Sequence, residues 1–205
     1  MDSPQAGEAV AWDANCCIKR ALSLGTHRDR PLRDFLTDPL RLFHDGCAPR
    51  GVENGYFELV KAESWKNIVK AVNQRAQQSG VTDRYKIKAY KDRAVGQLSD
   101  LFGSLTRFPY DVPDNAFTQA KQFFISNEVD VYSRTGVRKA SNIPEDNDIK
   151  IFVATDRLPY DARYLLTDDS GLYAYAPEIE NSEYGVTIIE ARKLTVLLRE
   201  WEWPH

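Results

Sequence analysis

Cysteine and histidine are scarce in this 205-residue chain, which contains three of each. Cys16 and Cys17 are adjacent, so a disulfide between them would be strained, and the odd count leaves one thiol over. We therefore expect reduced thiols rather than a disulfide framework. His44 precedes Cys47 by three residues, but no second Cys-x-x-Cys or His-x-His unit accompanies them. The sequence thus predicts neither a metal site nor a cofactor.

A cysteine–histidine nucleophile is a further use of these residues. Cys47 or Cys17 would have to meet His27 or His44, and only the fold can bring such residues together. Histidine is absent from residues 45–204, so this pair is not expected to organise the second half of the chain.

Long apolar runs are also missing from the sequence. No segment approaches the roughly 20 apolar residues that span a bilayer. The first eight residues carry no basic end followed by an apolar stretch, so they do not form a secretory signal. These absences predict a cytoplasmic protein with no membrane partner, and they leave open an export route that reads no cleaved signal.

Phosphate-binding loops of the common kinds are absent as well. Residues 51–55 read Gly-Val-Glu-Asn-Gly, but no Lys followed by Ser or Thr stands where a P-loop needs it, and no Gly-x-Gly-x-x-Gly occurs. The acidic stretches 145–148 and 168–169 lack the ligand spacing of a calcium loop. We expect them to be solvated turns.

Apolar spacing along the chain predicts one α+β domain over residues 11–205, after a flexible tail over residues 1–10. Helices are expected through residues 11–126, and a strand-rich, largely antiparallel part through residues 127–205. The expected strands of this second part are 129–132, 149–154, 163–167, 172–176 and 186–189. Asp-Asp-Ser-Gly at 168–171 is interpreted as a hairpin turn, and a helix is favoured near the end of the chain.

The charge distribution is more informative than the net charge of −3. Residues 61–93 contain nine Lys or Arg and three acids, whereas residues 142–190 contain eleven acids and three basic residues. A helix from Ser64 and an alternating strand over residues 84–90 would form a basic surface, with Tyr85 inward and Tyr90 outward. Its predicted partner-binding residues are Lys66, Lys70, Arg84, Lys86, Lys88 and Tyr90.

Two classes of function remain from these observations. The first is a non-enzymatic binding protein of the adaptor, inhibitor or immunity type, which captures a macromolecule through its basic or its acidic surface. A protein partner is the first expectation and nucleic acid the alternative, because a pI of about 5.7 is low for a dedicated nucleic-acid binder.

The second class is a small toxin-like effector enzyme that acts on a nucleotide or a nucleic acid. ADP-ribosyl transfer from NAD uses a Glu-x-Glu pair and an arginine, for which Glu178, Glu180 and Arg134 are the residues to test. Only 43 residues separate Arg134 from Glu178, which is short for that kind of core. Convergence of the three side chains on one pocket would favour this class.

Overall fold

A single parallel sheet forms the centre of the molecule. The computed structural model describes residues 1–22, 35–135 and 143–203. Within them, five strands lie in the order β3-β2-β1-β4-β5, and every neighbouring pair is parallel. The strands are β1 (Ala9–Trp12), β2 (Glu53–Tyr56), β3 (Thr106–Arg107), β4 (Arg163–Thr167) and β5 (Val186–Glu190).

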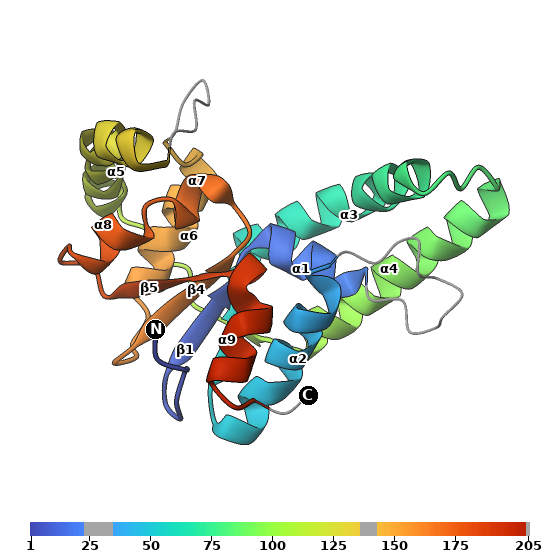
Figure 1. Ribbon diagram of the computed structural model, residues 1–205, viewed down its shortest axis with the longest axis horizontal. Helices are drawn as coiled ribbons and strands as arrows, with labels where there is room; N and C mark the ends of the chain where they lie inside the picture. Colours follow the sequence, from blue (N-terminus) through green and yellow to red (C-terminus); the bar gives the residue numbers. More distant parts are fainter. Residues whose placement is uncertain (23–34, 136–142, 204–205) are drawn as a thin grey trace.

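Helices connect these strands and cover the sheet (Figure 1). They are α1 (Ala14–Ala21), α2 (Thr37–Cys47), α3 (Glu58–Gln78), α4 (Arg84–Ser104), α5 (Asp114–Thr135), α6 (Asp146–Asp156), α7 (Ser170–Tyr173), α8 (Ala176–Glu180) and α9 (Leu194–Glu200). Short 3₁₀ turns occupy Ala48–Arg50 and Ala191–Lys193. No described helix combines the length and the apolar character that crossing a bilayer requires.

The expected α+β class with an antiparallel C-terminal part is wrong. Two expected strands, 163–167 and 186–189, are present as β4 and β5, but they pair in parallel, with α7 and α8 between them. Residues 129–132 lie in α5, residues 149–154 in α6, and residues 172–176 in the α7–α8 region. Residues 149–154 are largely buried in α6, and a short buried apolar run has the same composition in a helix as in a strand. In 129–132 only Val131 is buried, while Val129 is exposed.

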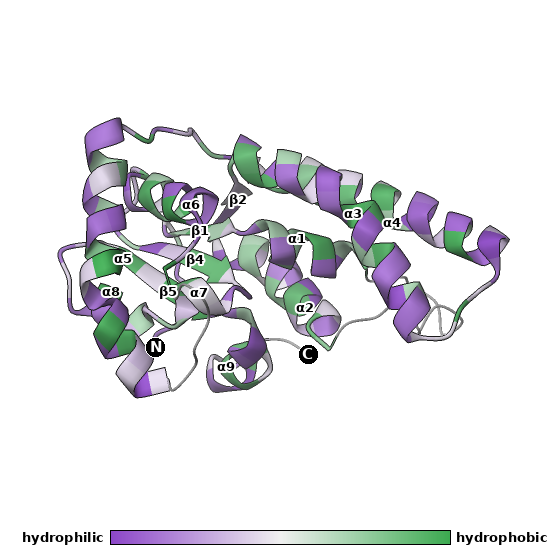
Figure 2. Cartoon of the chain, turned by 90° about the horizontal axis from the view of Figure 1, so that it is seen from above, coloured by the Kyte–Doolittle hydropathy of each residue, from purple (hydrophilic) through white to green (hydrophobic). Residues whose placement is uncertain are grey.

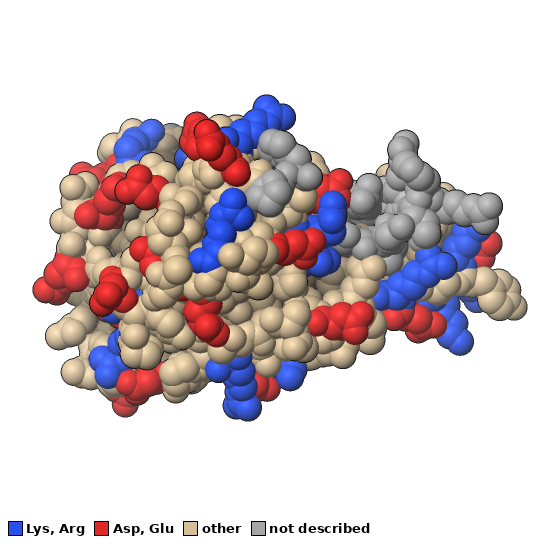
Figure 3. Space-filling model, turned by 90° about the horizontal axis from the view of Figure 1, so that it is seen from below, with Lys and Arg blue, Asp and Glu red and all other residues tan. Residues whose placement is uncertain are grey.

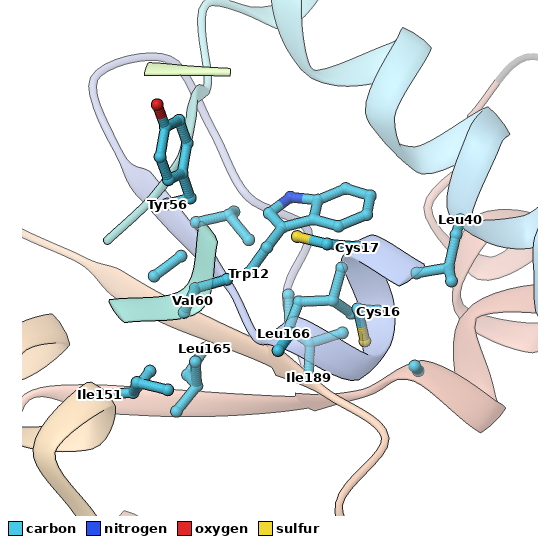
Figure 4. Packing of buried hydrophobic residues seen from close by; sticks show 14 of the residues in the cluster. Trp12, Cys16, Cys17, Leu40, Tyr56, Val60, Ile151, Leu165, Leu166 and Ile189 are labelled. Carbon is cyan, nitrogen blue, oxygen red and sulfur yellow. The ribbon is translucent and has the colours of Figure 1, made fainter. Parts of the chain in front are cut away.

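The N-terminal boundary also differs from the expectation. The predicted tail over residues 1–10 overlaps β1, because Ala9 and Val10 form the first half of this central strand. All four residues of β1 are fully buried, as expected for a parallel strand covered on both faces. The Cys16 and Cys17 thiols lie in the same core, close to Trp12 and Leu40 (Figure 4). All three cysteines are free and buried.

Helices α3 and α4 form a long hairpin that extends beyond the sheet, here called the arm (residues 58–104; Figures 1 and 2). The predicted strand at 84–90 is therefore wrong. Asp83 caps α4 by accepting hydrogen bonds from the Tyr85 and Lys86 N–H groups. Ile87, Tyr90 and the buried Ala94 follow one another at helical spacing. This longer pattern outweighs the polar–apolar alternation of residues 84–90 that indicates a strand.

Candidate active site

Acidic residues follow both central strands at the carboxyl edge of the sheet. Asp13 comes directly after β1, and Asp168 and Asp169 come directly after β4. The strands are adjacent, with Trp12 opposite Leu166. After β1 the chain adds β2 and β3 on one side of this strand, and it then adds β4 and β5 on the other side. The direction in which strands are added therefore reverses between β1 and β4. Open parallel sheets bind their ligands at this point.

Asp13 is fixed by hydrogen bonds from the first turn of α1 and from the end of β4. Its Oδ1 accepts from the Cys16 N–H at 2.7 Å, which caps α1, and its Oδ2 accepts from the Thr167 hydroxyl and from the Asp168 N–H at 3.2 Å. The side chain is almost fully buried. Burial raises the pKa of Asp13 to about 6, although these hydrogen bonds favour the carboxylate.

Asp168 is neutralised by two cations and has a structural role. One carboxylate oxygen contacts the Lys19 ammonium of α1, and the other accepts from Arg192 Nε at 2.9 Å. Asp168 is buried, and such a charge is tolerated when it is paired. These contacts hold α1 and the segment after β5 against the end of β4.

Asp169 belongs to a second group of carboxylates, here called the acidic cluster. Its members come from β1, α3, the start of α6 and the end of β4: Asp13, Glu63, Glu145, Asp148 and Asp169. Burial, followed by the charges of the other four members, raises the pKa of Asp148 to about 7. Burial and the charge of Glu145 likewise raise the pKa of Glu63. The cluster thus concentrates negative charge around Asp148, which is partly buried, while Glu145 is exposed.

A cation is the ligand that this arrangement favours. Several carboxylates close together are stabilised by a positive charge, and Mg²⁺ prefers oxygen ligands while keeping several of its waters. Within the ranges that the structure describes, no three His, Cys, Asp or Glu side chains converge tightly enough to hold a metal ion. The described residues of the cluster therefore lack a direct set of three metal ligands, and any divalent cation bound there would be held largely through water.

The predicted basic residues lie on the arm. Five of the six are exposed: Lys66 and Lys70 on α3, and Arg84, Lys86 and Lys88 on α4. Tyr90 is only 7% exposed and packs in the core, while Tyr85, expected inward, is 87% exposed. The two tyrosines exchange roles because the segment is a helix. Figure 3 shows Lys and Arg side chains grouped near the outer end of the arm, with a few acids among them.

The residues proposed for ADP-ribosyl transfer meet only in part. Arg134 Nη2 donates to both carboxylate oxygens of Glu178, at 2.8 and 3.0 Å, and to the Ala174 carbonyl. Glu180 is exposed at the end of α8. The three side chains line three different hollows of the surface, so they do not form the single pocket that this chemistry requires.

A cysteine–histidine nucleophile has no support among the described residues. His44 contacts Asp45 and the Ser104 hydroxyl, each at 3.0 Å. Burial raises the pKa of all three thiols, that of Cys47 to about 12, which disfavours the reactive thiolate. His27, the other residue considered for this pair, lies outside the described residues.

Sequence reasoning missed the acidic cluster, although part of its signal is visible. Ala-Val-Ala-Trp precedes Asp13, and Tyr-Leu-Leu-Thr precedes Asp168 and Asp169; each is a short apolar run that ends in an acid. A buried strand followed by a carboxylate is the pattern of a site at the carboxyl edge of a parallel sheet. Glu63 and Asp148 stand on helices and carry no comparable local signal. Comparisons of the chain with protein-family models, curated proteins and solved structures found no match.

Proposed function

We propose that this protein is a hydrolase that cleaves phosphodiester bonds of nucleic acid with the help of a divalent cation. The observation that carries the proposal is the acidic cluster at the switch point between β1 and β4. Carboxylates that hold Mg²⁺ or Mn²⁺ at such an edge support phosphoryl chemistry, in which the cation offsets negative charge on the phosphate oxygens.

The reaction consumes one water for each bond that is cleaved. A water oxygen bonds to phosphorus while one ester P–O bond breaks, leaving a phosphate monoester on one product and a hydroxyl on the other. Asp148, whose pKa is raised to about 7, is suited to accept the proton of the attacking water. The departing oxygen takes its proton from solvent.

The arm supports nucleic acid as the substrate. Glu63 of the acidic cluster lies on α3, and the same helix then presents Lys66 and Lys70 to solvent. Exposed cations beside an anionic catalytic centre hold a polyanion by its phosphates, which the carboxylates alone would repel. In this proposal the basic residues of the arm bind the substrate, and the acidic cluster cleaves it.

Asp169→Asn tests the proposal. Asn retains the oxygen that accepts the Gly171 N–H at 2.5 Å, so the start of α7 is preserved, but it loses the charge. We expect wild-type protein to cleave labelled single-stranded RNA or DNA in Mg²⁺ or Mn²⁺ and not in EDTA. Asp169→Asn should lower this rate by about 100-fold or more, whereas Asp100→Asn, an exposed acid of α4, should not.

A binding measurement without substrate completes this test. Mn²⁺ should raise the Tm of the wild type, because a ligand of the native state stabilises it, and should raise that of Asp169→Asn less. Cleavage that persists in EDTA, or that is equal in Asp169→Asn and Asp100→Asn, would overturn the proposal.

A non-enzymatic binding protein is the competing proposal, and the exposed cations of the arm support it. It predicts that the protein captures its macromolecular partner, whether protein or nucleic acid, without turnover in any divalent cation. Binding of the oligonucleotide with no cleavage in Mg²⁺ or Mn²⁺ would favour this second function.

A further inference from the structure

A polar groove runs between α1 and α3, beside the acidic cluster. Its volume is about 440 Å³. The lining combines four amides, three cations and three apolar residues: Asn15, Asn67, Gln74, Gln78, Lys19, Lys70, Arg75, Ile18, Leu22 and Ala71. None of the described residues that line it is acidic. An anionic ligand therefore fits this groove better than a cationic one.

The groove continues from the acidic cluster along both helices. On α1, Asn15 follows Asp13 by two residues. On α3, Asn67 stands one turn beyond Glu63 and begins a stripe at helical spacing that continues through Lys70, Gln74 and Gln78. From residue 67 to residue 78 this stripe is about 16 Å long.

We propose that the α1–α3 groove binds a single strand of nucleic acid and leads one of its phosphodiester bonds to the acidic cluster. This inference rests on the proposed function for the class of its ligand. The exposed Lys70 is placed to contact a phosphate, while the amides donate to and accept from base edges and sugar hydroxyls. Ala71 offers partly exposed apolar surface to the faces of the bases, while Ile18 and Leu22 are buried beneath the groove.

The size of the groove selects a single strand over a duplex. Its 440 Å³ is far too small to enclose a double helix, whose major groove alone is about 12 Å wide. An unpaired strand presents its base edges and its backbone together, so a narrow polar groove can contact both. Lys19 joins the two regions, because it lines the groove and also pairs with Asp168 at the end of β4.

Two double variants of α3 test the groove against the charge of the arm as a whole. Gln74→Glu/Gln78→Glu adds two acids inside the groove. Asn73→Glu/Gln77→Glu adds two acids at exposed positions on the neighbouring face of the same turns, outside the groove lining. Net charge, helix and spacing are the same, so the two variants differ only in the face that they alter.

Binding is measured by fluorescence anisotropy with labelled single-stranded RNA and DNA in EDTA, so that no cleavage is needed. The groove variant should weaken binding by about tenfold, and the matched variant by less than about twofold; unfolding curves check that both are folded. Equal weakening by the two variants would overturn the groove, as would tighter binding of a duplex.

The two proposals fail in different ways in this experiment. If groove variants lose binding but the wild type cleaves nothing in Mg²⁺ or Mn²⁺, the groove stands and hydrolysis falls. If the wild type cleaves the strand and Gln74→Glu/Gln78→Glu binds and cleaves as well as the wild type, hydrolysis stands and the groove falls.

Discussion

The carboxyl edge of the sheet and the outer end of the arm carry opposite charges and are held in opposite ways. At the edge, Asp13 and Asp168 are buried and tied by hydrogen bonds and ion pairs to neighbouring elements. On the arm, Lys86 and Lys88 are exposed on a helix that packs against α3. Fixed geometry thus occurs where a bond would be broken, and flexible cationic side chains occur where a polyanion would first be met.

The same two regions differ in how their residues are distributed along the chain. Nine cations of the arm lie within one segment, residues 61–93, so they stand out in a charge profile of the sequence. The acidic cluster combines four segments between Asp13 and Asp169. Three of its members lie in the acidic stretch 142–190, whereas Asp13 and Glu63 stand far from that stretch in the sequence. Local charge density therefore identifies the arm, while the proposed hydrolysis would depend on residues that only the fold assembles.

The sheet should be the region less tolerant of added volume, and Gly55→Ala gives the largest expected effect. A Cβ on this β2 residue would lie 2.4 Å from the Thr106 carbonyl oxygen and 2.7 Å from the ring of Phe108. Backbone of the neighbouring strand cannot yield without breaking the ladder. We expect a loss of about 2–3 kcal/mol in the free energy of unfolding, measured by chemical denaturation. An unchanged midpoint would show that β2 and β3 tolerate a wider spacing.

Asp148→Asn should stabilise the protein in a pH-dependent way. The pKa of Asp148 is raised to about 7, so the folded state pays for its ionisation. Below pH 4 Asp148 is protonated in both the folded and the unfolded state, so it does not lower the free energy of unfolding. As the pH rises to 7 the carboxyl ionises more readily in the unfolded state, and the free energy of unfolding falls. At pH 8 the variant should gain about 2 kcal/mol, reduced from the full linkage value because Asp148 is partly exposed.

Unfolding at pH 4 and pH 8 without divalent cations measures this difference. Asp161→Asn removes an exposed carboxylate outside the acidic cluster and should show no comparable gain. An equal gain at both pH values would mean that packing, and not repulsion among the acids, causes the effect of Asp148→Asn.

The sequence predicted β4 and β5 but not the architecture that they form. Strands of four or five residues that are buried on both faces carry no alternation, and the apolar helix α6 has the same appearance over 149–154. Parallel pairing depends on the helices between the strands, so misassigning 172–176 as a strand converted a crossover into a hairpin.

For the candidate functional residues, the sequence predicted which charged side chains are exposed but not where the side chains lie in the fold. Lys66, Lys70 and Lys88 are exposed in the structure because a charged side chain remains solvated on a strand or on a helix alike. Tyr90 and Tyr85 were misplaced because an aromatic ring follows the period of the element, and a seven-residue alternation concealed a helix of 21 residues. Asp169 was interpreted as part of a turn, since its partners Glu63 and Asp148 are distant in sequence.

Lys86→Glu/Lys88→Glu should separate attraction by the arm from recognition in the groove. Both side chains lie on α4 outside the groove lining, so we expect slower association with the single-stranded probe and little change in dissociation. At low salt the association rate should fall by about tenfold, and at high salt the difference should shrink because salt screens exposed charges. Stopped-flow fluorescence measures both rates, and an unchanged association rate would remove the outer arm from the contact surface.

Gly96→Ala gives the smallest effect and has the opposite sign from the same change in the sheet. Gly96 lies in the interior of α4, where an added Cβ would meet nothing within 4 Å. Alanine also favours a helix over glycine, because glycine loses more backbone entropy on folding. The free energy of unfolding should therefore rise by about 0.5–1 kcal/mol, measured by the same denaturation as for Gly55→Ala. A lower free energy of unfolding would instead mean that another part of the molecule covers this face of the arm. The contrast between a solvated arm and a closely packed sheet would then not hold.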